Sequence, residues 1–221
     1  MKPSQDRVRT QATYDSLSRF YDVLSGSAED QARQQAVDLL NIQLGDILLE
    51  VGCGTGTAAI EMGGKVGHVG FVYGVDLSIK MLRAAQKKLQ RKGMQTSVGL
   101  LSGDAVNLPL SSQSVTGVLL SFALELFPDE EITLVLSECK RVICQGGRLC
   151  VLSMSKCQPQ ARLLKPYMWL HDHFPAWIDC RPILLQQTLA RHGFDIIEAR
   201  QDSLFGLPIE IVLAKPKGES W

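Results

Sequence analysis

The sequence predicts an α/β protein built on a doubly wound, mostly parallel β-sheet. Short, continuous apolar runs such as DILLEV (46–51) are typical of strands buried on both faces of a parallel sheet. Segments with apolar residues at helical spacing separate these runs, and this alternation implies parallel strands joined by helices. The expected strands are 46–51, 68–76, 96–105, one within 114–127 (a range that includes its exit loop), 146–154, 194–200 and 209–216. The expected helices are 29–40, 78–93, 129–144 and 183–193.

The segment 78–93 carries the clearest helix signals. Its apolar residues fall on one face, Ser78 suits an N-cap, the last turn is basic, and Gly93 follows as a stop. We therefore expect an amphipathic helix that starts immediately after the second strand.

Length and composition fit one globular domain, or one domain with a small appendage. The 221 residues are 45% apolar and 21% charged. Because 23 basic side chains balance 23 acidic ones, we do not expect a nucleic-acid partner. The longest strongly apolar stretch, 117–127, is short and contains Glu125, so we expect no transmembrane segment.

The cysteines and the N-terminus indicate a cytoplasmic location. Six cysteines occur, none in a CxxC pair, which argues against a zinc ribbon or a thioredoxin-like site. Most lie in apolar runs, where cysteine behaves as a small hydrophobe. The N-terminus lacks the apolar core of a secretory signal, so we expect a reducing compartment and no disulfide framework.

The order of patterns divides the chain into four expected segments. Residues 1–45 form a helical N-terminal segment, and 46–154 form the core of the sheet. Residues 155–182 contain four of the nine prolines and two of the three tryptophans, so we expect a lid insertion outside the sheet. Residues 183–221 return to the helix–strand pattern and complete the sheet.

Three glycines follow the first expected strand at alternate positions, Gly52, Gly54 and Gly56. They permit either a tight strand-to-helix turn or the close approach of a ligand to the backbone. In a doubly wound sheet, ligands bind beyond the carboxyl ends of the strands, where this turn lies. The GxGxG spacing differs from the GxGxxG fingerprint of dinucleotide binding, and it suits a ligand that lacks a pyrophosphate.

A carboxylate follows the second strand. Asp76 comes twenty residues after Gly56, at the position where an acid accepts hydrogen bonds from both hydroxyls of a ribose. A role as a helix cap is the alternative, although Ser78 is available for that task. The spacing favours the ribose interpretation.

Several segments together resemble the motifs of class I S-adenosylmethionine-dependent methyltransferases. In chain order they are ILLEVGCGTGTAA, VYGVDLSIKML, GDAVNLPL, SFALELF and RVICQGGRL. The segments 13–25 and 184–199 resemble the branch that contains the ubiquinone and menaquinone C-methyltransferases. The resemblance runs from about residue 13 to residue 215. It implies a Rossmann-like, seven-stranded, mostly parallel sheet with an antiparallel C-terminal strand, and S-adenosylmethionine as the cofactor.

The resemblance also implies a set of cofactor-binding residues. Glu50 would interact with the cofactor's ammonium group, Asp76 with the ribose and Asp104 with the adenine amine. Ser121 and Phe122 would lie nearest the sulfonium. The full set implied is Tyr21, Glu50, Gly52, Cys53, Gly54, Gly56, Asp76, Leu77, Ser78, Asp104, Ala105, Ser121 and Phe122. Tyr21 and Phe122 are also compatible with packing in a core.

No residue stands out as the catalytic base. The candidates are Glu125, His171, His173 and His192, and the sequence does not choose among them. A base is needed only where the acceptor must lose a proton, as a phenol or an activated ring carbon does.

The acceptor is expected to be a small apolar or aromatic molecule. The stretch SFALE lacks the Asn/Asp-Pro-Pro-aromatic motif that resembling amino-methylases carry, which disfavours adenine or glutamine as substrates. The aromatic residues within 165–182 form either a lid over the acceptor or a cover for the sheet end. Arg181 would pair with an anionic substrate group or with Asp179. We expect no metal site, although Cys157 and Cys180 keep a thiol-ligand site open.

Two other functions compete with methyl transfer. One is a non-catalytic protein that binds S-adenosylmethionine, and the other is a nicotinamide-dependent oxidoreductase. The glycine spacing argues against the second. The sequence leaves the oligomeric state undetermined.

Overall fold

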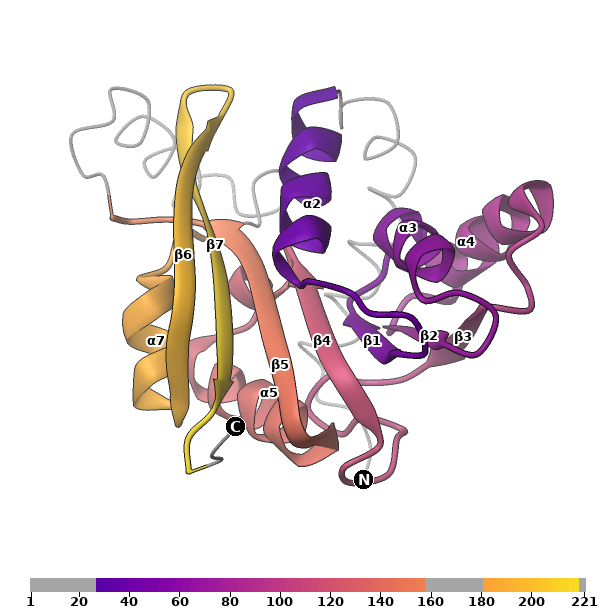
Figure 1. Ribbon diagram of the computed structural model, residues 1–221. Helices are drawn as coiled ribbons and strands as arrows, with labels where there is room; N and C mark the ends of the chain where they lie inside the picture. Colours follow the sequence, from indigo (N-terminus) through magenta and orange to yellow (C-terminus); the bar gives the residue numbers. More distant parts are fainter. Residues whose placement is uncertain (1–26, 158–180, 219–221) are drawn as a thin grey trace.

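The computed structural model of the chain describes residues 27–157 and 181–218, and there it forms an α/β fold (Figure 1). Within these ranges seven strands make one sheet in the order β3-β2-β1-β4-β5-β7-β6. The strands are β1 (Ile47–Val51), β2 (Phe71–Asp76), β3 (Val98–Ser102), β4 (Val115–Ser121), β5 (Ile143–Met154), β6 (Phe194–Leu204) and β7 (Leu207–Pro216).

Strands β1 to β5 run parallel, whereas β7 is antiparallel to both of its neighbours, β5 and β6. The strand order reverses at β1, which pairs with β2 on one side and with β4 on the other. The predicted Rossmann-like, mostly parallel sheet with an antiparallel C-terminal strand is therefore confirmed. The reversal point is where such sheets leave a crevice for a ligand.

Helices cover both faces of the sheet (Figure 1). The helices are α2 (Ser27–Leu39), α3 (Thr57–Lys65), α4 (Ile79–Lys92), η1 (Leu124–Leu126), α5 (Asp129–Val142) and α7 (Leu185–Arg191). Helices α2, α3 and α4 contribute to an apolar core on one face, and α5 and α7 to a second core on the other. The central strands are buried on both faces, which explains the continuous apolar runs in the sequence.

The β6–β7 hairpin extends farther than the sequence predicts. We expected the sixth strand to end at residue 200 and the seventh to begin at 209, but only Phe205 and Gly206 separate the two. Both residues have positive φ, 51° and 79°, as a tight two-residue hairpin turn requires. Strand β6 lies at the sheet edge and exposes most of its side chains, so its polar residues 201–203 give no apolar signal.

The structure describes only parts of the expected N-terminal segment and of the expected lid insertion. Helix α2 corresponds to the expected helix 29–40, while Tyr21 lies outside the described residues. Most of the expected lid, residues 158–180, also lies outside them. Arg181 pairs with Asp129 at 2.6 Å. The division into four segments stays a prediction.

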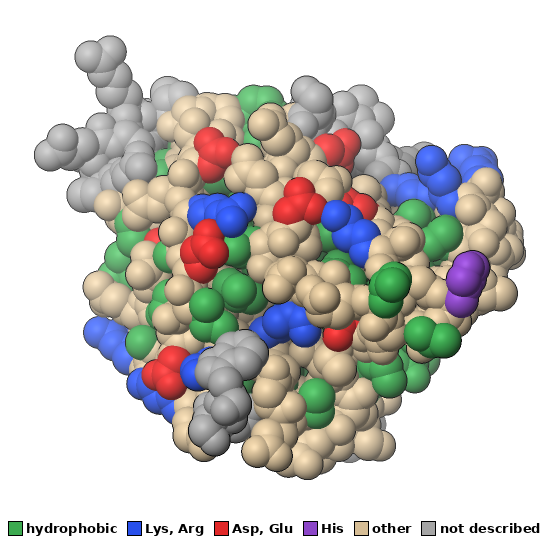
Figure 2. Space-filling view, viewed as in Figure 1, with side chains coloured by type: hydrophobic (Ala, Val, Ile, Leu, Met, Phe, Trp, Pro, Cys, Tyr) green, Lys and Arg blue, Asp and Glu red, His purple; other side chains and the backbone are tan. Residues whose placement is uncertain are grey.

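Acidic and basic side chains are interspersed over much of the viewed face (Figure 2). Among the helices that the structure describes, none is long and apolar enough to cross a membrane.

Candidate functional site

A cavity of about 450 Å³ lies at the carboxyl ends of β1, β2, β3 and β4. This volume is in the range of small-molecule sites. Eleven of the residues implied by the sequence line it: Glu50, Gly52, Cys53, Gly54, Asp76, Leu77, Ser78, Asp104, Ala105, Ser121 and Phe122. The structure thus brings together residues spread over more than seventy positions of the chain.

The glycine loop between β1 and α3 serves both purposes considered above. All three glycines have positive φ, between 51° and 75°. A Cβ on Gly52 would meet Ala123 at 2.9 Å, and one on Gly56 would meet Ala85 at 3.0 Å, so these two allow tight packing. Beside Gly54 no atom lies within 4 Å of such a Cβ, and this residue lines the cavity. Gly54 therefore leaves room for a ligand, whereas Gly56 does not line the cavity and acts in packing.

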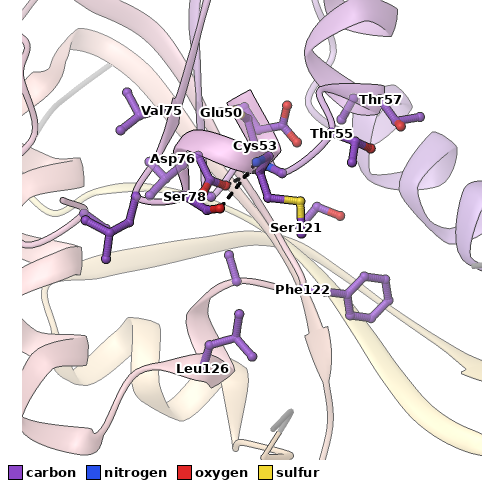
Figure 3. Close-up of a pocket in the computed structure, with 18 of the residues that line it drawn as sticks. Glu50, Cys53, Thr55, Thr57, Val75, Asp76, Ser78, Ser121, Phe122 and Leu126 are labelled. Carbon is purple, nitrogen blue, oxygen red and sulfur yellow. Dashed lines mark hydrogen bonds between the residues drawn. The ribbon is translucent and has the colours of Figure 1, made fainter. Parts of the chain in front are cut away.

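Asp76 joins the glycine loop to the start of α4 (Figure 3). Its Oδ2 accepts a hydrogen bond from the Gly54 amide at 2.7 Å, and its Oδ1 accepts one from the Ser78 amide at 2.8 Å. Burial raises the pKa of Asp76, and the amides of Ser78, Gly54 and Leu77 partly offset this effect. An ionised carboxylate has about four lone-pair sites, so Asp76 can also accept hydrogen bonds from hydroxyls of a ligand beside these amides.

Ser78 caps α4 as predicted, because its Oγ accepts a hydrogen bond from the Met81 amide at 3.3 Å. The helix ends at Gly93, whose φ of 66° is the left-handed conformation expected there. Because Ser78 caps the helix, the Asp76 carboxylate does not serve as the cap. It is oriented by the amides of the glycine loop and of the start of α4.

Asp104 follows β3 and shapes the next wall of the cavity. Its Oδ1 accepts a hydrogen bond from the Val106 amide at 3.1 Å, and its backbone bridges to Asn107. Ala105 is buried beside it. The tight turn at Asp104 therefore fixes a polar and a small apolar residue side by side on the cavity wall.

Glu50 ends up almost fully buried, with 3% of its surface exposed, although it lines the cavity. Its Oε2 has no hydrogen-bond partner among the described residues. Burial raises the pKa of Glu50 to about 8, and the positive charge of Arg33 acts in the opposite direction. At neutral pH the carboxyl is therefore mostly protonated, and it would ionise if a cation came within reach.

The exit of β4 contributes a second buried polar atom. The Oγ of Ser121 has no hydrogen-bond partner among the described residues, and Ser121 lines the cavity. Phe122 adopts a φ of 51°, which is uncommon for a bulky residue and is often found at functional sites. Its amide is fixed by a hydrogen bond to the Leu152 carbonyl at 2.8 Å. Two buried polar atoms that lack a partner among the described residues, Glu50 Oε2 and Ser121 Oγ, thus belong to residues that line the same cavity.

Cys53 is buried in the glycine loop, and burial raises its thiol pKa well above the usual value. The thiol is therefore neutral and unsuited to act as a nucleophile.

Several lining residues were not found from the sequence. Helix α2 supplies Arg33, which donates hydrogen bonds to Glu29 at 2.7 Å and Asp30 at 2.6 Å. Arg33 lies among polar residues of α2, which give no sign of a binding site in the sequence. Lys88 of α4 reaches the hydroxyls of Thr55 and Thr57, at 3.1 and 2.9 Å. The available signal for Lys88 was its helical spacing: it lies about one turn after Ala85, and Ala85 packs against Gly56 of the glycine loop.

The segment after β4 adds an apolar wall. It consists of Leu126, Phe127 and Pro128, and Glu131 of α5 follows. Over the whole cavity six acidic side chains and two basic ones are present, the acids being Glu29, Asp30, Glu50, Asp76, Asp104 and Glu131, and the bases Arg33 and Lys88. Even with Glu50 mostly protonated, the acidic side chains outnumber the basic ones, and this charge favours a cationic ligand.

Neither of the two candidate bases that the structure describes, Glu125 and His192, lines the cavity. Glu125 is buried, and its Oε1 accepts a hydrogen bond from the Met154 amide at 3.2 Å. His192 lies at the end of α7, near Thr133 and the Thr188 carbonyl. His171 and His173 lie outside the described residues. No catalytic base is assigned by this geometry.

The described residues contain no cluster of three or more metal-ligating side chains. Cys157 lies 3.6 Å from a carboxylate oxygen of the buried Glu210, and Cys180 lies outside the described ranges.

Comparisons with known proteins agree with this geometry. A demethylmenaquinone methyltransferase of Lactobacillus johnsonii is 32% identical over 158 residues, which cover 72% of this chain and 62% of that protein. The chain thus matches less than two thirds of that relative's length. A demethylmenaquinone methyltransferase of Oceanobacillus iheyensis is 31% identical over 229 residues, covering 90% of this chain and 92% of that protein.

A solved structure of an S-adenosylmethionine-dependent methyltransferase from Aquifex aeolicus has the same fold. Its TM-score is 0.66 at 19% identity, and the match covers 89% of this chain and 97% of that one. The model of the ubiE/COQ5 methyltransferase family matches residues 4–177, most of the chain. The chain therefore belongs to the ubiE/COQ5 methyltransferase family, which confirms the predicted relationship to the S-adenosylmethionine-dependent methyltransferases.

Proposed function

We propose that this chain binds S-adenosylmethionine in the cavity at the carboxyl ends of β1 to β4 and transfers its methyl group to a small apolar acceptor. The observation that carries the proposal is the combination of Asp76, oriented by the glycine loop, with two buried polar atoms that lack partners within residues 27–157 and 181–218, Glu50 Oε2 and Ser121 Oγ. Buried polar atoms without partners are costly, so such atoms on a cavity wall indicate a ligand that satisfies them.

Each end of the cofactor has a matching group on the cavity wall. Asp76 would accept hydrogen bonds from the ribose hydroxyls, and Asp104 with Ala105 would hold the adenine. The open space beside Gly54 would take the amino-acid part of the cofactor, with Glu50 near its ammonium group.

Ser121 and Phe122, at the end of β4, would lie near the sulfonium. Tyr21 is proposed to cover the cofactor from the N-terminal segment.

The charge of the cavity supports a cationic cofactor over a dinucleotide. S-adenosylmethionine carries a positive sulfonium, while the pyrophosphate of a nicotinamide cofactor is negative. The lining holds more acidic than basic side chains even with Glu50 protonated, and this charge favours the former. The shorter glycine spacing supports the same choice, because the loop lacks the extra residue of the dinucleotide fingerprint.

When bound, S-adenosylmethionine supplies a methyl group on a sulfonium, and transfer to the acceptor breaks the carbon–sulfur bond and leaves neutral S-adenosylhomocysteine. The chain's task is to hold the acceptor in line with that bond and to exclude water. Such positioning contributes roughly 7–11 kcal/mol in favourable cases.

A quinone-like or phenolic acceptor is the favoured class. The relatives named above are demethylmenaquinone methyltransferases, which supports a carbon atom of a reduced quinone ring as the methylated position. The apolar wall formed by Leu126, Phe127 and Pro128 would contact such a ring. We also propose a cytoplasmic, reducing location, since the five cysteines in the described part of the chain are all unpaired.

Calorimetric titration with S-adenosylmethionine and with NAD tests the choice of cofactor. We expect saturable binding of the first and none of the second at equal concentration. A second assay follows radiolabelled methyl transfer to a reduced demethylmenaquinone analogue. Binding without transfer to any quinol or phenol would favour the non-catalytic alternative, and tighter binding of NAD would contradict the proposal.

A further inference from the structure

Helix α4 carries an unusual concentration of positive charge. Its fourteen residues contain six lysines and arginines and no acid, although the chain as a whole is neutral. Figure 2 shows the lysine and arginine side chains gathered at the upper right of the molecule, where Figure 1 places α4.

Four of these cations form one stripe. Lys80, Arg83, Lys87 and Arg91 are spaced three or four residues apart, so they share a helix face about 16 Å long. All four are exposed. We call this set the basic stripe. The apolar residues that α4 buries against the sheet, among them Ala85, lie on the opposite side of the helix, so the basic stripe faces directly outward.

Three cations of the stripe, Arg83, Lys87 and Arg91, differ in their partners from several arginines elsewhere in the described part of the protein. Arg33, Arg141 and Arg148 each pair with a carboxylate at 2.7 Å or less. Arg83, Lys87 and Arg91 have no carboxylate within ion-pair distance in residues 27–157 and 181–218. Their mutual repulsion is thus left uncompensated by the described part of the protein, which favours an external anionic partner.

Two exposed apolar side chains lie beside the stripe. Ile79, the first residue of α4, is 43% exposed and lies one turn from Arg83. Leu77 is 39% exposed and also lines the cavity. A basic helix face flanked by exposed apolar side chains is the pattern of surfaces that bind anionic lipid bilayers. Leu77 lines the cavity and lies only three residues before Lys80 of the basic stripe, so the outer face of α4 begins next to the cavity.

We propose that the outer face of α4 docks on the surface of an anionic lipid bilayer, with the basic stripe against the headgroups and Ile79 at the interface. A nucleic-acid partner fits less well, because α4 contains no aromatic residue on which a base could stack. This surface lies outside the cavity, so the docking of α4 on a bilayer does not depend on the proposed methyl transfer.

Vesicle co-sedimentation of the full chain tests the proposal. Vesicles of phosphatidylcholine with about one third phosphatidylglycerol are compared with vesicles of phosphatidylcholine alone, at low salt. We expect binding to the anionic vesicles only, and loss of that binding as salt is raised. Each cation near an anionic surface contributes about fivefold in affinity, so R83Q/K87Q/R91Q should weaken binding by about 100-fold.

The matched control is K140Q/R191Q/K217Q, which removes three exposed cations near α5 and α7. It should bind within about threefold of the unaltered chain, and both triple variants should keep their affinity for S-adenosylmethionine. Ile79→Ser should lower vesicle binding several-fold but leave binding to heparin, a soluble polyanion, unchanged. Equal losses in both triple variants, no binding to anionic vesicles, or tighter binding to an RNA oligonucleotide at equal salt would overturn the proposal.

Discussion

Replacing Glu50 by glutamine should stabilise the ligand-free protein at neutral and alkaline pH. The carboxyl is buried, and its pKa of about 8 lies well above the 4.5 of an ordinary glutamate. In the unfolded chain Glu50 ionises near pH 4.5, whereas in the folded chain it keeps its proton up to about pH 8. The folded state is therefore favoured most below pH 4.5, and that advantage is lost as the pH rises to about 8.

The size of the effect follows from the two pKa values. Their separation corresponds to about 5 kcal/mol in full and to about 3 kcal/mol at pH 7. The glutamine keeps a carbonyl oxygen that accepts from the Ala59 amide, as Glu50 does, but buries an amide donor at a cost of about 1–3 kcal/mol. The clearest signature is thus the slope, because E50Q should gain on the unaltered chain by about 1.4 kcal/mol per pH unit between pH 5 and pH 8.

Urea unfolding of both proteins at pH 5.5, 7 and 8.5, without cofactor, measures this slope. The control is Glu130→Gln, which changes an exposed carboxylate in the first turn of α5 and should give a flat difference. A pH-independent difference between E50Q and the unaltered chain would refute the account of Glu50.

The same substitution should weaken binding of S-adenosylmethionine by roughly 10- to 100-fold, because it removes a hydrogen bond to a charged group. Binding to the unaltered chain at pH 7 should release nearly one proton, since the positive charge of the cofactor's ammonium group would favour the ionised form of Glu50 and its proton would pass to the buffer. Calorimetry in two buffers of different ionisation enthalpy measures this release, and E50Q should show none.

Three further substitutions test the site and its support. Asp76→Ala should weaken S-adenosylmethionine binding by about 1–3 kcal/mol in calorimetry, and unchanged affinity would argue against the ribose assignment. Ser121→Ala removes a buried hydroxyl that has no partner among the described residues, so chemical denaturation should show equal stability or a gain of up to about 1 kcal/mol. Methyl transfer should become slower. A loss of stability would contradict the role of Ser121 as a ligand-facing group. Arg148→Met breaks a part-buried ion pair with Asp46, which directly precedes β1 at the end of that strand opposite to the cavity. It should cost about 3–5 kcal/mol in unfolding free energy while the folded fraction keeps its cofactor affinity, and an equal loss of affinity would show that the site depends on this pair.

The sequence predicted the central strands well because their burial on both faces leaves continuous apolar runs. It predicted the ends of α4 equally well, because Ser78 and Gly93 are specific cap residues. Strand β6 was placed too short, since an edge strand carries polar side chains that do not differ from those of a loop.

The cavity lining shows a similar division. Asp76 was identified because it ends a strand at the edge of the sheet where ligands bind, whereas Glu50 and Asp104 were identified through the resemblance to the methyltransferase motifs. Arg33 and Lys88 were missed because they reach the cavity from helices, and only tertiary packing decides which face of a helix points inward. The role of Glu50 as a buried, protonated acid was also beyond the sequence, since it depends on an exposure of 3%.

Crystals of the chain grown with S-adenosylhomocysteine provide the most direct measurement. Electron density should show the ribose hydroxyls within 3.2 Å of the Asp76 carboxylate and the amino group beside Glu50. Density for the nucleoside elsewhere, or a cavity closed to it with Asp76 engaged only by its two backbone amides, would contradict the assignment of this site.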